Sequence, residues 1–106
     1  MMNALPPQDP EGFLLHREDW TPTVARALAA EDDRTLTPDH EAVILLVQTF
    51  YDRYGIAPNN RALVRAVKTT LGPEQGSSMA LMKLFGGTPA KTVAKYAGLA
   101  KPPHCL

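Results

Sequence analysis

The chain has 106 residues and a mass of 11.6 kDa, which fits one domain with a single hydrophobic core. Its apolar fraction of 44% and charged fraction of 21% are close to globular averages and exclude extended disorder and fibrous architectures. The formal net charge is zero, yet residues 1–52 carry three basic and ten acidic side chains, whereas residues 53–106 carry eight basic and one acidic. Two interpretations stay open: attraction between two halves of one fold, or a basic face that attracts an anionic partner.

The sequence indicates a cytoplasmic protein without membrane contact. The longest apolar run, residues 42–47, is far shorter than the roughly 18 residues that a membrane span needs. The N-terminus lacks the basic flank, apolar stretch and cleavage site of a secretory signal. One cysteine excludes an internal disulfide. We therefore expect a cytoplasmic location.

The N-terminal segment predicts little regular structure. Residues 1–11 contain three prolines, which indicates a loose lead-in. Residues 12–15, GFLL, predict a short strand or one arm of a β-hairpin.

Five helical segments follow. Thr-Pro pairs mark three of their starts, because proline at the first helical position lacks only an N–H that would have no helical partner. Glycines mark most of the ends. The predicted helices span about residues 22–30, 38–54, 60–71, 78–85 and 89–97. We therefore expect a mainly α fold, a small bundle of about five helices with a short N-terminal β-hairpin.

Apolar residues recur at helical spacing within these segments and define a predicted core face. Tyr51 and Tyr54 continue the apolar face of the second helix, and we interpret them, like Tyr96, as packing residues rather than catalytic ones. Met79 and Met82 belong to the apolar residues of the fourth helix.

Residues 99–106, LAKPPHCL, predict a mobile C-terminal arm that follows a helical domain over residues 1–98. The pair Pro102-Pro103 cannot continue a helix and favours an extended, semi-rigid segment. Cys105 follows this pair near the terminus, where burial is least common. A single cysteine is ordinarily a small core residue, but this position indicates a thiol that another protein can reach.

Reactivity of Cys105 requires its thiolate. Lys101 and His104 favour the anion and the terminal carboxylate opposes it, so the direction of the pKa shift stays open. The pair His104-Cys105 is a weak match to a cysteine hydrolase, because adjacent residues of an extended segment point to opposite sides and no oxyanion donor is recognisable. These two residues supply only two metal ligands, and His16 and His40 show no ligand spacing, so we expect neither a metal nor a cofactor.

From about Gly12 to Leu106 the chain resembles the DsrC/TusE family of sulfur-relay proteins. The resemblance rests on ordered segments, namely EGFL before Trp20, RALAAE, YDRYGIAPNNRALVRAV, LGPEQGSS, TPAKTVAKYAGL and KPPHCL. It implies a helical fold with a small N-terminal hairpin and a flexible C-terminal arm. In TusE-like members the penultimate cysteine receives persulfide sulfur and serves tRNA 2-thiouridylation, and Cys105 occupies that position.

The resemblance also implies the partners. Cys105 would accept sulfur from an upstream donor complex and pass it to an acceptor enzyme such as a tRNA 2-thiouridylase. The chain would thus be a sulfurtransferase-type persulfide carrier that acts only with partner proteins and comes near tRNA only indirectly. Four residues, Lys101, His104, Arg61 and Lys91, are expected to contact the persulfide anion or an acidic partner.

Three alternatives stay open. The first is a partner protein of dissimilatory sulfur oxidation or sulfite reductase, although such members carry a second cysteine eleven residues earlier, where this chain has Ala94. The second is a helix-turn-helix DNA-binding regulator in which Arg61, Arg65 and Lys68 contact DNA, which is disfavoured because many small bundles contain such a corner. The third is a noncatalytic module that docks through its arm.

Overall fold

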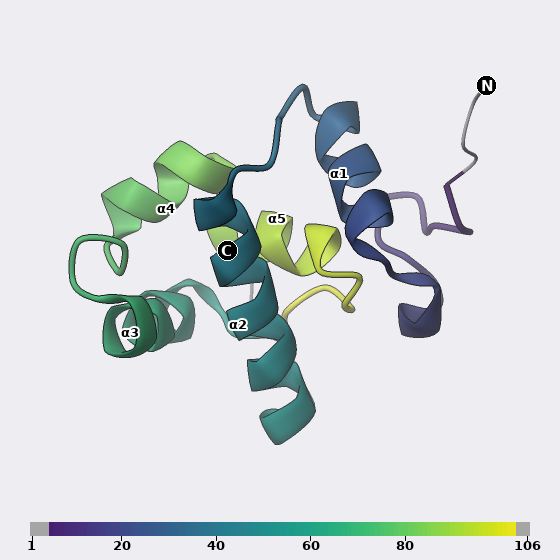
Figure 1. Cartoon of the computed structure of the whole chain (residues 1–106). Helices are drawn as coiled ribbons and strands as arrows, with labels where there is room; N and C mark the ends of the chain where they lie inside the picture. Colours follow the sequence, from purple (N-terminus) through teal and green to yellow (C-terminus); the bar gives the residue numbers. More distant parts are fainter. Residues whose placement is uncertain (1–4, 104–106) are drawn as a thin grey trace.

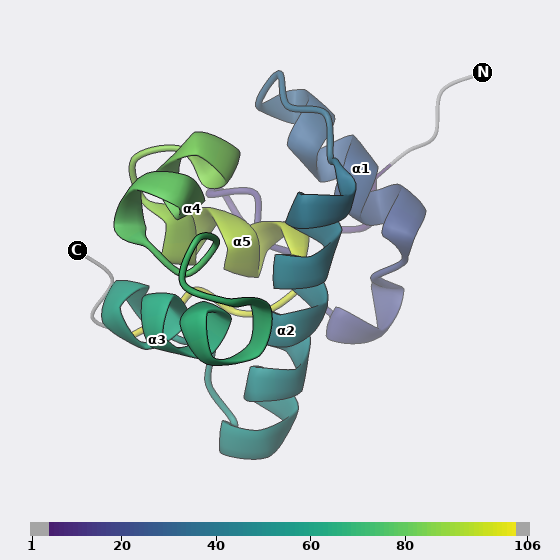
Figure 2. The ribbon, with the colours of Figure 1, turned by 60° about the vertical axis from the view of Figure 1, so that its left-hand side comes forward.

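The computed structural model describes residues 5–103, in which the helices pack around a short central one. They are η1 Arg17–Asp19, α1 Pro22–Glu31, α2 Pro38–Tyr54, α3 Asn60–Leu71, α4 Ser78–Phe85 and α5 Pro89–Tyr96. Helix α5 contacts α1, α2, α3 and α4 (Figure 1). Helices α3 and α4 lie on one side of α5 and α1 lies on the other (Figure 2). The mainly α prediction with five helical segments is confirmed.

Local side-chain caps begin most of these helices. Thr21, Thr37, Asn59 and Ser77 each accept a hydrogen bond from the backbone N–H three residues later, which satisfies a donor that has no partner inside the helix. Thr88 makes no such bond, although Pro89 still occupies the first position of α5. The helix starts predicted at about residues 22, 38, 60, 78 and 89 are confirmed.

The core is built on α5 and the helix ends that surround it. Tyr96 and Phe85 are both 0% exposed and are its largest fully buried side chains. His40 packs its ring against Phe85, with centroids 5.1 Å apart, and its Nε2 lies 2.7 Å from the carbonyl oxygen of Leu84. The second histidine of the sequence therefore joins α2 to α4 within the core.

Three apolar residues of the predicted helix faces lie at the surface, although Tyr54 still packs its ring on Phe50, with centroids 4.6 Å apart. Tyr54 is 58% exposed, and Met79 and Met82 are 72% and 48% exposed. Tyr54 is exposed because α2 is long: it has 17 residues, and its last turn extends beyond the helices that it packs on (Figure 1). Tyr96 is buried as predicted, whereas Tyr51 is half-buried beside the guanidinium of Arg17.

The predicted N-terminal hairpin is not confirmed. Within residues 5–103 the strand-like pairing is one isolated bridge between Gln8 and Leu14. The N–H of Leu15 donates to the carbonyl of Pro7 at 3.0 Å, but Pro6 and Pro7 have no N–H with which to continue the ladder. The segment instead forms a tight turn that buries Phe13 at 2% exposure.

In the described part of the chain, residues 5–103, every helix is too short or too polar to cross a lipid bilayer.

Candidate functional site

Cys105 and His104 lie outside the described residues, so the site is built from the chain that leads to them. Leu99 is 1% exposed and Pro102 is buried, whereas Lys101 and Pro103 are exposed. The chain therefore remains packed on the helices as far as Pro102. The boundary predicted at residue 98 falls within this packed stretch, and the mobility of the arm stays a prediction.

The end of α5 sets the direction in which the arm leaves. The N–H of Gly98 donates to the carbonyl of Lys95 at 3.1 Å, and the N–H of Leu99 donates to the carbonyl of Ala94 at 3.0 Å. This pair of bonds is a Schellman motif, which requires a left-handed residue after the cap. Gly98 has a φ of +75° and meets that requirement.

Side chains from two other elements hold the same helix end. The indole Nε1 of Trp20 donates to the carbonyl of Tyr96 at 2.7 Å. The amide Nε2 of Gln48, on α2, donates to the carbonyl of Ala97 at 2.9 Å. Because helix-terminal carbonyls have no partner inside the helix, these bonds fix the end of α5 rather than leaving it to water.

A turn in the N-terminal segment presents Glu11. The carboxylate Oδ1 of Asp9 accepts from the N–H groups of Glu11 and Phe13, each at 2.9 Å. The N–H of Gly12 donates to the carbonyl of Asp9 at 3.0 Å. Since Phe13 is anchored in the core, the turn holds Glu11 at a defined place on the surface.

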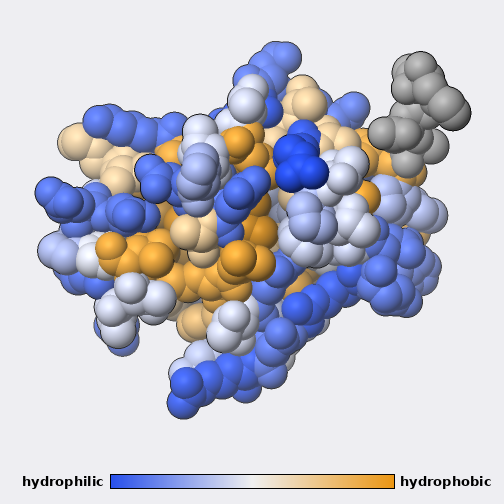
Figure 3. Space-filling view, viewed as in Figure 1, coloured by the Kyte–Doolittle hydropathy of each residue, from blue (hydrophilic) through white to orange (hydrophobic). Residues whose placement is uncertain are grey.

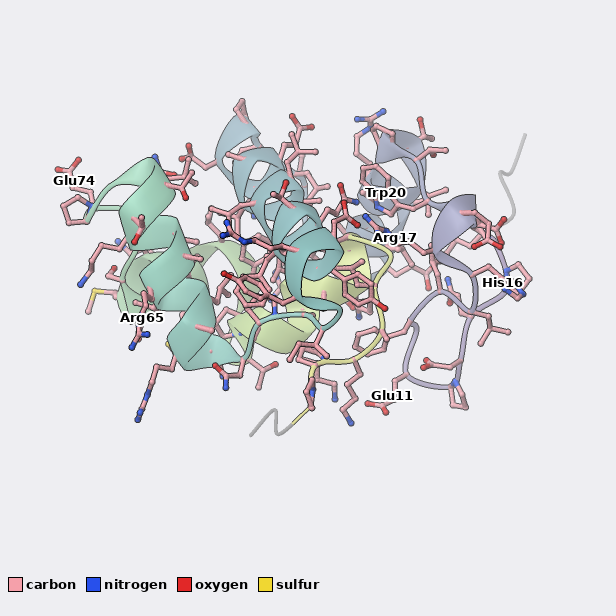
Figure 4. The ribbon with its side chains drawn as sticks, turned by 90° about the horizontal axis from the view of Figure 1, so that it is seen from below. Glu11, His16, Arg17, Trp20, Arg65 and Glu74 are labelled. Carbon is pink, nitrogen blue, oxygen red and sulfur yellow. The ribbon has the colours of Figure 1, made fainter. Side chains whose placement is uncertain are left out.

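Glu11 connects α5 to the base of the arm. Its Oε1 lies 2.9 Å from Nζ of Lys91, and its Oε2 lies 3.3 Å from Nζ of Lys101. Figure 4 shows Glu11 beside the C-terminal segment. Hydrogen bonds from Lys91 and then from Lys101 lower the pKa of Glu11 below its ordinary value. We call Glu11, Lys91 and Lys101 the arm-base cluster.

Arg61 is the remaining basic candidate among the described residues. It is exposed in the first turn of α3 and forms no ion pair within residues 5–103. Its neighbour Asn60 accepts a hydrogen bond from the N–H of Ala90 at 2.9 Å, which joins the start of α3 to the start of α5. Lys91 follows Ala90, so Arg61 and Lys91 lie on helix starts that touch.

A second charged network lies on α5. The hydroxyl of Tyr96 donates to Oδ2 of Asp32 at 2.7 Å and accepts from Nη1 of Arg34 at 3.0 Å. Nζ of Lys95 lies 3.0 Å from the same carboxylate oxygen. Burial and the bond to Asp32 raise the pKa of Tyr96 to about 12. Burial pushes the pKa of Asp32 upward, but the bonds from Tyr96 and Lys95 and the charge of Arg34 bring it below its ordinary value.

A polar hollow of about 400 Å³ lies between the two networks and is lined by Glu11, Asp32, Arg34, Lys91 and Lys95 among others. These charges pair with one another, so the hollow has no excess of one sign. Within residues 5–103, no three His, Cys, Asp or Glu side chains gather as a metal site requires.

Sequence reasoning identified Lys91 and Lys101 but missed Glu11, which brings them together. The charge imbalance between the two halves of the sequence could have indicated these ion pairs. Glu11 and Asp32 belong to the acidic half, and their partners Lys91, Lys95 and Lys101 belong to the basic half. Attraction between the halves therefore accounts for part of the asymmetry. The other five basic residues of the second half form no ion pair within residues 5–103; they are Arg53, Arg61, Arg65, Lys68 and Lys83.

Comparison with known proteins places this geometry in a family. A family model described as DsrC like protein matches residues 4–106. A sulfurtransferase TusE homolog from Haemophilus influenzae is 43% identical over 92% of this chain and 90% of its own length. Sulfurtransferase TusE from Sodalis glossinidius is 41% identical over 92% of this chain and 91% of its own.

Two solved structures share the fold. The NMR structure of DsrC from Allochromatium vinosum has a TM-score of 0.85 and 41% identity and covers 93% of this chain and 88% of its own. The oxidized gamma-subunit of dissimilatory sulfite reductase, DsrC, from Archaeoglobus fulgidus has a TM-score of 0.82 and 34% identity and covers 94% and 91%. Sequence and fold agree over nearly the whole length, and the chain belongs to the family of DsrC-like proteins.

Proposed function

We propose that this chain is a cytoplasmic sulfur carrier that accepts a persulfide sulfur on Cys105 and delivers it to an acceptor enzyme, in tRNA 2-thiouridine synthesis. One observation carries the proposal: relatives named sulfurtransferase TusE align with 92% of a chain that has a single cysteine. A sulfur atom carried as a persulfide on this chain has only Cys105 to bind to.

The chemistry is an exchange between thiolates. The Cys105 thiolate attacks the outer sulfur of a donor persulfide, a new S–S bond forms at Cys105, and the donor sulfur bond breaks. The donor cysteine leaves as a thiolate, so one sulfur atom moves without net oxidation or reduction. A thiolate of the acceptor then attacks the outer sulfur on Cys105 in the same way. Both steps need a partner protein.

Chain geometry limits where the exchange takes place. Successive Cα atoms are about 3.8 Å apart, so the Cα of Cys105 lies at most about 7.6 Å from that of Pro103. A partner must therefore bring its reacting sulfur close to Pro103 and hence to Lys101. Lys101, with Lys91, Arg61 and His104, would favour the persulfide anion or contact acidic residues of the partner.

A role beside sulfite reductase is less well supported. The solved relatives include a protein described as a sulfite reductase subunit. The position at which such members carry a second cysteine is Ala94, a fully buried residue of α5 in this chain. A cycle that needs two thiols in one chain is not open to it.

The test is intact mass spectrometry of the full chain after incubation with a persulfide-bearing sulfurtransferase. Wild type should gain the mass of one sulfur on the C-terminal peptide, reversibly with reductant, and Cys105→Ser should gain none. A host that lacks the chain should lose 2-thiouridine from its tRNA and recover it with wild type but not with Cys105→Ser. Recovery by Cys105→Ser would instead indicate a noncatalytic docking module.

A further inference from the structure

An open apolar groove lies between α2 and α3, with a volume of about 740 Å³. We define the α2–α3 groove by six of the residues that line it: Leu45, Leu46, Phe50, Tyr54, Ala62 and Ala66. Those from α2 recur at the three- and four-residue spacing of one helix face. Those from α3 are small, so they leave room beside the larger side chains of α2.

Two large apolar side chains of this groove are exposed to solvent. Leu45 and Tyr54 are each 58% exposed. Figure 3 shows hydrophobic side chains gathered in the region between α3 and α2, bordered by hydrophilic ones. Scattered exposed apolar residues need no explanation, but a continuous patch inside a hollow is typical of a docking surface.

The length of the groove matches a helix of about three turns. Its lining on α2 runs from Ala42 to Tyr54, which is about 18 Å at 1.5 Å per residue. An occupant helix of about 12 residues would fill that length. It would present apolar side chains at three- and four-residue spacing, as in other helix-in-groove complexes.

The rim of the groove is positive. Arg53 and Arg65 belong to its lining, which contains no carboxylate. Both arginines lack an ion pair within residues 5–103, and Figure 4 shows Arg65 on the outer side of α3. The acidic residues Glu41 and Asp52 of α2 are paired with arginines elsewhere.

We propose that the α2–α3 groove binds the apolar face of an acidic amphipathic helix that belongs to a partner protein. The apolar floor takes the helix face, and the arginines at the rim pair with its carboxylates. A second copy of this chain fits less well, because a symmetric dimer would bring the arginine rims together. Duplex DNA would match the charge of α3 but would leave Leu45 and Tyr54 exposed.

The test uses the full chain and a fluorescent helical peptide of about 14 residues with leucines at i, i+3, i+4 and i+7 and glutamates on its other faces. A second peptide replaces each glutamate by lysine. Wild type should bind the acidic peptide saturably and at least about tenfold more tightly than the basic one, which corresponds to about 1.4 kcal/mol. Backbone amide shifts in NMR spectra should change along α2 and α3.

Matched variants locate the binding. Leu45→Glu and Arg65→Glu should each weaken binding of the acidic peptide about tenfold, and Arg65→Glu should strengthen binding of the basic peptide. Met79→Glu, at an exposed apolar residue of α4 outside the groove, should change nothing. If circular dichroism shows that Leu45→Glu is unfolded, Thr49→Glu, at an exposed residue of the lining, replaces it.

Four results would overturn the proposal. The first two are a lack of saturable binding of the acidic peptide within its solubility, and equally tight binding of both peptides. The other two are binding of the acidic peptide that Leu45→Glu and Thr49→Glu leave unchanged, and a dimer in sedimentation that Leu45→Glu dissociates. Binding of duplex DNA that Arg65→Glu abolishes, without peptide binding, would identify α3 as a nucleic-acid contact instead. None of these measurements depends on Cys105, so they are independent of the sulfur-carrier proposal.

Discussion

Gly98→Ala should destabilise the fold at the point where α5 ends and the arm begins. Gly98 adopts the left-handed conformation, with a φ of +75°, inside the Schellman motif. A Cβ at this position would lie 2.7 Å from Cδ1 and 2.8 Å from Cβ of Trp20. Trp20 cannot move away freely, because its Nε1 donates to the carbonyl of Tyr96.

The magnitude follows from two separate costs. A left-handed conformation costs a residue with a Cβ roughly 1–2 kcal/mol. Forcing an extra methyl group into a packed site costs about 1–3 kcal/mol more. The free energy of unfolding should therefore fall by about 2–5 kcal/mol, which lowers the Tm of a chain of this size by at least about 8 °C.

Gly55→Ala is the matched control. Gly55 ends α2 with a φ of +78°, but a Cβ there would meet nothing within 4 Å. It should show the backbone cost alone, about 1–2 kcal/mol. Urea unfolding followed by circular dichroism measures both variants. Repeating Gly98→Ala in a Trp20→Gly background, which removes Cδ1, Cγ and Cβ of Trp20, should reduce its cost to that of Gly55→Ala. Equal costs for Gly98→Ala and Gly55→Ala in wild type would refute the contact with Trp20.

The remaining predictions concern the core and the two charged networks. Phe85→Ala removes a fully buried ring and should lower the free energy of unfolding by about 3–5 kcal/mol in urea titrations; a loss below about 1 kcal/mol would mean that the site collapses around the cavity. Tyr96→Phe keeps the buried ring but removes a donor to Asp32, so the pKa of Asp32 should rise in carbon-13 NMR titrations and stability at neutral pH should fall by about 1–3 kcal/mol. Glu11 should titrate below its ordinary pKa, so its ion pairs are present above that value and are lost as the pH falls through the lowered pKa. Lys91→Ala should raise the pKa of Glu11 more than Lys101→Ala, since Lys91 is the closer partner, and the reverse order would contradict the geometry.

The described part of the chain limits where the proposed exchange on Cys105 would take place. The arm-base cluster holds Lys101 on the helical body, and Pro102 is buried beyond it. The distance that Cys105 can lie from the helical body is therefore set by the two residues after Pro103, and not by the seven residues after Gly98. A partner would have to approach the side of the molecule that carries Glu11 and Lys91. The α2–α3 groove offers a separate surface for a partner helix.

Local sequence was sufficient for the helices because their signals act over a few residues. Four residues each cap a backbone N–H three positions later, namely Thr21, Thr37, Asn59 and Ser77. Gly55 ends α2 because it adopts the left-handed conformation, with a φ of +78°. Such interactions do not depend on the rest of the fold. The single cysteine and its position after two prolines could likewise be interpreted without a structure.

The tertiary structure alone decided which of these helices cover one another and which charges meet. Glu11 and Lys101 are 90 residues apart in sequence, and Tyr96 and Asp32 are 64 apart. Periodicity could assign Tyr54 to an apolar helix face, but not show that α2 outreaches its neighbours and leaves that face exposed. A pattern along one helix specifies a direction around its axis, whereas burial depends on the length and placement of every helix beside it.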